Sequence, residues 1–229
     1  SSNWIATGSG DVIVGGIADN MAMTLHPTHA NVWQVTLSDV DGVYPVESGW
    51  DADGIPVPYT KETGLNNLAQ NGDFHYSGST LSIYWAGGSQ PVCNTDLFVV
   101  RNGVNNEFTE SSLTSAITTY MEGFHWMGGC QYDCGVAGVK HYAYNNKYTS
   151  KRENTGTATV KVSNYADIRF NNCKAGYSGN DHFNYHNNGG YETNPVGVEL
   201  NCLAKYPGYE NTGSNQSSTA HEDYFVLRI

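Results

Sequence analysis

The side chains best suited to acid–base chemistry form two short groups near the C-terminal end of the sequence. Asp181 and His186 make up the first group, and His221, Glu222 and Asp223 make up the second. Two carboxyl groups about 5 to 9.5 Å apart, one of them protonated, hydrolyse a glycosidic bond. A histidine acts as general acid or base near neutral pH. These residues therefore predict catalytic cleavage of a sugar linkage, provided that the fold brings the two groups together.

The same residues also have a structural interpretation. Histidine and aspartate side chains at a turn often only hydrogen-bond adjacent backbone groups and hold the turn in place. We keep both interpretations for His186 and His221, and we favour a site role for Asp181. Cleavage by β-elimination would need basic side chains to neutralise a sugar carboxylate, and the nearby candidates are only Arg169, Lys174 and Lys205. A hydrolase therefore ranks above a lyase.

Aromatic side chains gather in the same part of the chain, mostly outside apolar runs. Tyrosine faces stack on the C–H side of sugar rings while their hydroxyl groups stay in water. Some aromatic residues here, Phe183 above all, are expected in the core instead. The expected substrate-binding residues are Tyr177, Tyr185, Tyr191, Tyr206 and Tyr209.

A repeated segment predicts the fold that would position these groups. IRFNNCKA at 168–175 is echoed by VELNCLA at 198–204, which places Cys173 and Cys202 at equivalent positions. Their separation of about 29 residues lies within the periods of roughly 20 to 50 that mark solenoids. One period of short strands and turns makes one coil of a right-handed parallel β-helix. Cys202 should then lie over Cys173, and His221 near His186.

Asparagine precedes each repeated cysteine, at positions 172 and 201. Stacked side-chain amides satisfy one another's hydrogen bonds, and asparagine tolerates the left-handed backbone conformation that a sharp corner requires. Asn172 and Asn201 are therefore predicted to be structural corner residues.

The composition and the strand patterns predict an all-β chain with two parts. Charged residues make up 14% of it, whereas it has 26 Gly and 16 Tyr, which is typical of a loop-rich β-protein. Residues 1–96 are predicted to be an N-terminal segment rich in β-hairpins, with a strand at 32–37 and a hairpin at 73–85. Residues 97–229 are predicted to form the rungs, from short runs such as LFVV, AITTY, ATVKV, ADIRF, VGVEL and YFVLRI.

Charge and composition narrow the classes of partner. The formal net charge is −11, so a phosphate backbone or an anionic membrane surface is repelled on average. We expect neutral or zwitterionic glycans, no nucleic acid and no membrane insertion, because no run approaches the ~20 apolar residues of a membrane span. The cysteines are expected to be mostly buried thiols, and neither a metal nor a cofactor is predicted.

Several segments resemble the pectate-lyase-like right-handed β-helix proteins, in particular the phage tailspike and secreted polysaccharide-processing types. The resemblance rests on YMEGFHWMGG at 120–129, NNCKAGYSGNDHFNYHNN at 171–188, VELNCLAKY at 198–206 and NQSSTAHEDYFVLRI at 215–229. The family pattern Asp-Gly-Phe-Asn-Tyr-His has its glycine replaced here by His182, and a Ser-Thr-x-His-Asp-like segment is matched at 218–223.

This resemblance implies a protein outside the cell or on a virion surface that binds, and as a depolymerase cleaves, a surface polysaccharide. It also implies a homotrimer. The alternative is a non-catalytic adhesion or structural fibre module of the same fold, because β-helices host lyases, hydrolases, esterases and simple binders.

Overall fold

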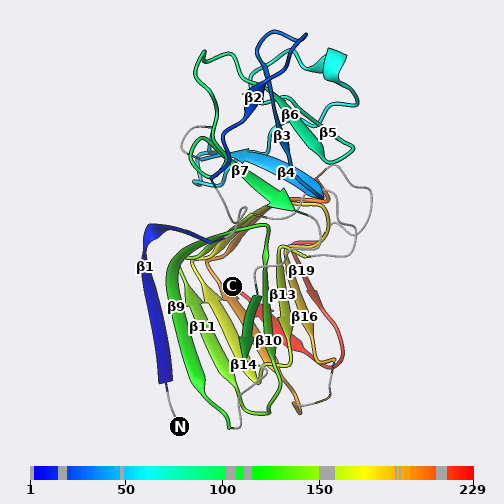
Figure 1. Ribbon diagram of the computed structural model, residues 1–229. Coiled ribbons are helices and arrows are strands. Elements are labelled where there is room, and N and C mark those ends of the chain that lie inside the picture. The colour runs from blue at the N-terminus through cyan, green and yellow to red at the C-terminus, as the bar shows by residue number, and fades with distance from the viewer. Residues whose placement is uncertain are drawn as a thin grey trace. The chain divides into compact units, whose positions relative to one another are not determined.

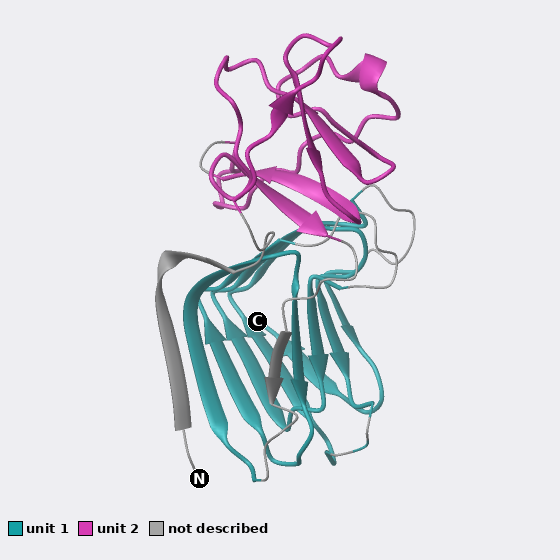
Figure 2. Cartoon of the chain, viewed as in Figure 1, with its two compact units in different colours: residues 1–15, 105–229 teal, residues 16–104 magenta. Residues whose placement is uncertain are grey.

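The computed structural model consists of β-strands and turns that divide into two compact units (Figure 1). It describes residues 3–14, 20–46, 49–101, 107–110, 115–149, 158–188, 190, 192–209 and 216–229, with 3–14 and 107–110 described by their backbone alone. The larger unit holds residues 1–15 and 105–229, and the smaller unit holds 16–104 (Figure 2). This division differs from the expected boundary after residue 96, because the first residues join the C-terminal part of the chain.

The larger unit is solenoid-like, with parallel strands stacked coil on coil in three walls. In wall 1, the first half of β9 (Thr118–Met127) is followed by β11 (Lys140–Tyr144), β14 (Asp167–Asn171), β17 (Val196–Leu200) and β20 (Phe225–Arg228). In wall 2, the second half of β9 is followed by β12 (Lys147–Thr149), β15 (Lys174–Ser178) and β18 (Leu203–Pro207). Wall 3 consists of β8 (Glu107–Glu110), β10 (Cys130–Cys134), β13 (Val160–Ser163), β16 (Phe183–His186) and β19 (Ser218–Ala220).

The corner between walls 1 and 2 is made by asparagines in the left-handed conformation. Asn145, Asn172 and Asn201 have φ of 54°, 54° and 51° on three successive coils. The backbone N–H of Asn172 donates to the carbonyl of Leu200 on the next coil at 2.9 Å, and the Asn172 side-chain amide donates to that of Asn145. The predicted corner role of Asn172 and Asn201 is thereby confirmed.

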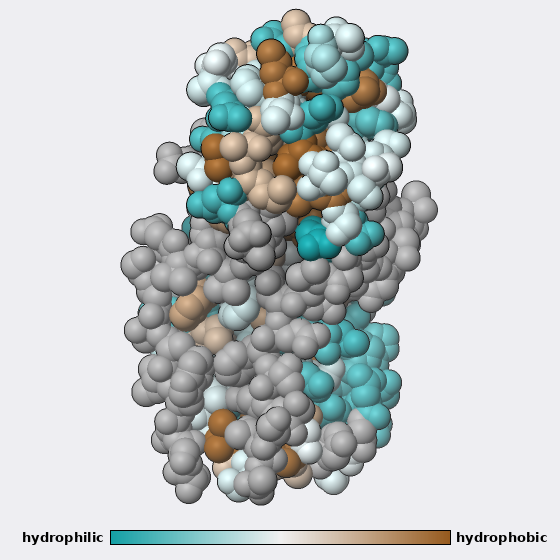
Figure 3. Space-filling view, viewed as in Figure 1, coloured by the Kyte–Doolittle hydropathy of each residue, from teal (hydrophilic) through white to brown (hydrophobic). Residues whose placement is uncertain are grey.

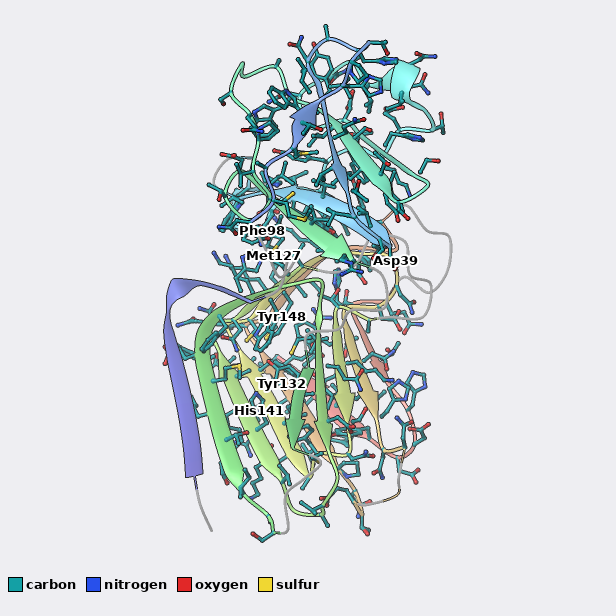
Figure 4. All side chains as sticks on the ribbon, in the orientation of Figure 1. Asp39, Phe98, Met127, Tyr132, His141 and Tyr148 are labelled. Carbon is teal, nitrogen blue, oxygen red and sulfur yellow. The ribbon has the colours of Figure 1, made fainter. Side chains whose placement is uncertain are left out.

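The interior of the larger unit is largely aromatic. Phe170 packs edge-on against Tyr132 and Tyr148, and its ring centroid lies 5.2 Å from that of Phe183. Figure 4 shows Tyr132 and Tyr148 between the walls, where their hydroxyl groups bond to each other at 2.8 Å. Such rings bury large apolar areas, and edge-to-face pairs add to the stabilisation. The alternation of inward aromatic and outward polar residues therefore fixes the register of the walls.

The predicted stacking of Cys202 on Cys173 is confirmed. The N–H of Leu203 donates to the carbonyl of Cys173 at 2.9 Å, and both thiols belong to the same core, Cys173 fully buried and Cys202 partly buried. Strands through residues 160–229 run parallel, as the repeat predicts.

In the sequence, the smaller unit is inserted between two strands of the larger unit. Strand β1 (Asn3–Val14) pairs with β9, and β8 pairs with β10, so strands on both sides of residues 16–104 belong to the same solenoid. The expected rung LFVV was wrong: it lies in β7 (Leu97–Arg101), which pairs antiparallel with β4 (Val40–Pro45) inside the smaller unit.

The remainder of the smaller unit is an antiparallel sheet in the order β2 (Thr24–Leu25), β3 (Val32–Thr36), β6 (Thr80–Tyr84) and β5 (Phe74–Ser77). The predicted hairpin is confirmed as β5 and β6, joined through Gly78 and Ser79 with φ of 55° and 65°. One 3-10 turn, η1 (Leu65–Asn67), is the helical element of the described residues. Nothing helical in these ranges has the length and apolar character that crossing a membrane requires.

Candidate functional site

Wall 3 brings the two expected histidines together on adjacent coils. The rings of His186 and His221 stack with centroids 4.5 Å apart and planes 7° from parallel. Glu222 Oε2 lies 3.5 Å from His186 Nδ1 and accepts the N–H of Asn187 at 3.0 Å. Figure 3 shows a hydrophilic surface on the larger unit, on the side where β16 and β19 lie in Figure 1. The expected proximity of His186 and His221 is confirmed.

The electrostatics of the cluster favour a neutral imidazole. Burial lowers the pKa of His186, and the neighbouring His221 and Lys161 lower it further, whereas the carboxylate of Glu222 raises it. Near neutral pH His186 is therefore mostly neutral, which is the form that can act as a general base. Glu222 and Asp223 form a tight turn with φ of 53° and 66°, a conformation that costs a non-glycine residue about 1 kcal/mol. The turn holds the Glu222 carboxylate beside the ring pair.

Asp181 lies apart from this cluster. It is buried at the start of β16, where its carboxylate accepts the N–H of Gln216 at 3.0 Å and the hydroxyl of Thr219 at 2.9 Å. The Asn184 amide also donates to it, at 3.4 Å. These bonds hold the turn that precedes β16, and the acid–base role expected for Asp181 stays a prediction.

Three of the expected sugar-binding tyrosines form one cluster at the end of wall 2. The Tyr177 and Tyr206 rings stack at 4.9 Å, and Tyr209 meets the Tyr177 ring edge-on at 5.3 Å. Tyr206 is 54% exposed, whereas Tyr177 is buried beneath it. Both stacked residues have φ of 55°, which is an outlying conformation for a bulky side chain.

The two remaining expected tyrosines are not at this surface. Tyr185 is fully buried, and its hydroxyl donates to Glu199 at 3.1 Å, so its ring belongs to the core and is closed to a surface ligand. This corrects the expectation, because alternation along β16 points Phe183 and Tyr185 inward and Asn184 and His186 outward. Tyr191 lies outside the described residues.

Sequence reasoning missed a groove on the outer surface of wall 1. Its volume is about 460 Å³, and its lining residues are Tyr120, Tyr142, Ala143, Tyr144, Arg169, Phe170, Asn171, Val198 and Leu200. We call this the wall 1 groove. Tyr120 and Tyr142 are direct partners on adjacent coils, and Arg169 is the next residue in the same column. The sequence signal for this groove was the alternate spacing of the tyrosines in KHYAY, together with Tyr120 in TTYME. Residues at every second position lie on one face of a strand.

The groove joins aromatic faces to fixed polar groups. The Arg169 guanidinium carbon lies 5.4 Å from the Tyr142 ring centroid, and the guanidinium forms a two-pronged pair with Asp167 at 2.9 and 2.8 Å. The Tyr120 hydroxyl donates to Glu122 at 2.8 Å. Burial and the Glu122 carboxylate raise the pKa of Tyr120 to about 12. The tyrosine rings can stack on the flat C–H faces of a ligand, and the polar groups beside them can hydrogen-bond to its edges.

In the described part of the chain, no group of three or more His, Cys, Asp or Glu side chains could hold a metal ion. No family model, curated protein sequence or solved structure matches this chain.

Proposed function

We propose that the larger unit is a right-handed parallel β-helix that binds a polysaccharide along the outer surface of wall 1. The observation that carries the proposal is the wall 1 groove, in which Tyr120, Tyr142 and Tyr144 lie on adjacent coils beside Arg169. Coils repeat about every 4.8 Å, so a stack of rings presents repeated contacts to a repeating chain of sugars. Extended, weakly charged ligands match such a surface better than compact ones.

The charge of the groove favours a neutral or zwitterionic glycan. The cation that faces it, Arg169, is already paired with Asp167, and the chain as a whole carries a formal charge of −11. A polyanion would therefore be repelled by the overall field. The resemblance to tailspike-type proteins adds the proposals that the protein is a homotrimer and acts outside the cell or on a virion surface. Light scattering of the purified chain tests the trimer.

Cleavage of the bound glycan is the second candidate function, favoured by the His186, His221 and Glu222 cluster. A neutral histidine held beside a carboxylate has the groups that general acid–base catalysis uses. Non-catalytic adhesion ranks first, because the Asp181 carboxylate is already bonded to the Gln216 N–H and the Thr219 hydroxyl, and the Glu222 carboxylate to the Asn187 N–H.

A glycan array with the purified chain, followed by titration of the best ligand, tests the binding proposal. Tyr142→Ala should weaken binding about tenfold, the effect of losing one ring contact of about 1.4 kcal/mol. Tyr84→Ala is the matched control, because it removes a partly exposed tyrosine from the smaller unit, and it should leave the affinity unchanged. Equal affinity of the Tyr142→Ala variant and the unaltered chain would overturn the groove assignment.

Mass analysis of the bound glycan separates adhesion from cleavage. Shortened products that vanish in the Glu222→Gln variant, while its affinity for the glycan persists, would establish the hydrolase. A glycan that stays intact during prolonged incubation with the unaltered chain establishes the binding module.

A further inference from the structure

Two histidines of the smaller unit face each other across a short loop. His26 and His29 lie in HPTH, between β2 and β3, and their Nδ1 atoms are 3.2 Å apart. The Thr28 hydroxyl lies 3.4 Å from His26 Nδ1 and 3.1 Å from His29 Nδ1, so the three atoms form a compact triangle. Both rings are partly buried.

The partners of each ring indicate which nitrogens carry lone pairs. The N–H of Thr28 donates to His26 Nδ1 at 3.2 Å, so this nitrogen is an acceptor. His29 Nε2 lies 3.1 Å from the carbonyl oxygen of the Asn66 side chain. In the tautomer in which Nε2 donates to this oxygen, Nδ1 of His29 carries a lone pair as well. In that tautomer two lone-pair nitrogens lie 3.2 Å apart, an arrangement that a cation between them stabilises, whereas in the other tautomer the Nδ1–H of His29 donates to His26.

The distances match those of a transition-metal site. Two imidazole nitrogens about 2.0–2.1 Å from a tetrahedral ion are about 3.3 Å apart, close to the separation of 3.2 Å seen here. The contact of His29 Nε2 with Asn66 is the outer hydrogen bond that metal-bound histidines characteristically make. The loop is also held in shape, since the N–H of His26 donates to Val32 at 2.7 Å and that of Val32 to His29 at 3.3 Å.

We infer that His26 and His29 bind one divalent transition-metal ion through their Nδ1 atoms. The Thr28 hydroxyl occupies the third corner, and water completes the coordination. Imidazole ligands select Zn²⁺, Cu²⁺ or Ni²⁺ over Mg²⁺ and Ca²⁺. Binding exchanges the long hydrogen bond from the Thr28 N–H for a metal–nitrogen bond. This inference is independent of the glycan proposal, because it concerns residues of the smaller unit alone.

Calorimetric titration of the full chain with Zn²⁺ at pH 7.5 tests the inference. We expect one ion per chain. His26→Ala and His29→Ala should each weaken binding more than tenfold, and Asn66→Ala about 10- to 100-fold through the lost outer contact. The control is His221→Ala, which removes one of another pair of adjacent histidines and should leave Zn²⁺ affinity unchanged. Absence of binding at millimolar Zn²⁺, or loss of binding in His221→Ala alone, would overturn the assignment.

A second measurement on the unaltered chain avoids any effect of the substitutions on folding. Co²⁺ broadens the NMR signals of nearby nuclei, and the signals of Thr28 and Asn66 should broaden first. Broadening centred on His186 and His221 instead would place the ion in the larger unit and refute the site.

Discussion

The imidazole of His221 lies flat on that of His186, with ring centroids 4.5 Å apart, although 34 residues intervene in the sequence. The stack follows from the parallel pairing of β16 with β19, which continues through the bond from the His221 N–H to the Tyr185 carbonyl at 3.0 Å. The neighbouring His221 disfavours the protonation of His186.

The proton affinity of His186 should therefore change in opposite directions in two variants. His221→Ala removes a neighbour that lowers the pKa of His186, so this pKa should rise. Glu222→Gln removes a carboxylate that raises it, so the pKa should fall. NMR titration of the histidine ring protons measures both shifts. Shifts of the same sign in the two variants would contradict the arrangement described here.

Stability should fall steeply on mild acidification because of three buried histidines. Burial lowers the pKa of His125 and of His141 to about 3, and that of His182 to about 4, each beside a threonine hydroxyl. The unfolded chain binds protons below pH 6.5 and the folded one does not, so stability present above pH 6.5 is lost as the pH falls toward 4. Each histidine removes up to about 1.4 kcal/mol per pH unit.

Urea unfolding at pH 7, 6 and 5 measures this loss. The variant His141→Gln keeps an acceptor for Thr119 but does not titrate, so the slope of its unfolding free energy against pH should be shallower. An exposed apolar residue gives the control, since Leu227→Ala should leave the slope nearly unchanged. Parallel slopes for His141→Gln and the unaltered chain would refute the assignment.

Two substitutions at the corner residue Asn172 separate backbone conformation from side-chain bonding. Asn172→Gly keeps the left-handed conformation and loses the amide contact with Asn145, at a cost of about 1 kcal/mol. Asn172→Ala loses the contact and also strains the backbone, at about 2 to 3 kcal/mol in total. Unfolding free energies in urea check the order, and a glycine variant less stable than the alanine variant would contradict it.

Arg228 should stabilise the last coil in a pH-dependent manner. Its Nε lies 3.3 Å from Oε2 of the fully buried Glu199, whose pKa is raised by burial in the core. Arg228→Met leaves this carboxylate without its cation and should cost about 2 to 3 kcal/mol at pH 7. The cost relative to the unaltered chain should shrink toward pH 5 as Glu199 takes up a proton. A cost independent of pH would show that only packing was lost.

Much of the larger unit was predictable because its signals are local and repeated. The asparagines that precede Cys173 and Cys202 predicted the position of the corner and the length of one coil. Both predictions rest on the left-handed backbone conformation that one tight turn requires. LFVV was misplaced because a short apolar run fits a parallel rung and an antiparallel ribbon equally well. Only tertiary pairing, here with β4, decides between them.

The site was harder to predict than the fold. Alternation within β16 could have shown that Tyr185 faces inward, because its neighbours His186 and Asn184 are polar. The wall 1 groove depends on how β9, β11 and β14 align, and a shift of one residue would turn Tyr142 to the interior. The facing of His26 and His29 depends on a hydrogen bond to Asn66, which is distant in the sequence.

Residues 16–104 are inserted between β1 and β8, two strands of the larger unit. The larger unit should therefore tolerate other sequences at this position. The entropic cost of closing a loop grows only with the logarithm of the loop's length. A coil whose loop already contains a folded unit therefore loses little further stability when that loop becomes longer. Replacing 16–104 by a short flexible linker, or by an unrelated domain whose ends lie close together, should leave the stacked coils able to assemble. Assembly of such a variant would show that residues 16–104 are separable from the coils, which are formed by residues on both sides of them.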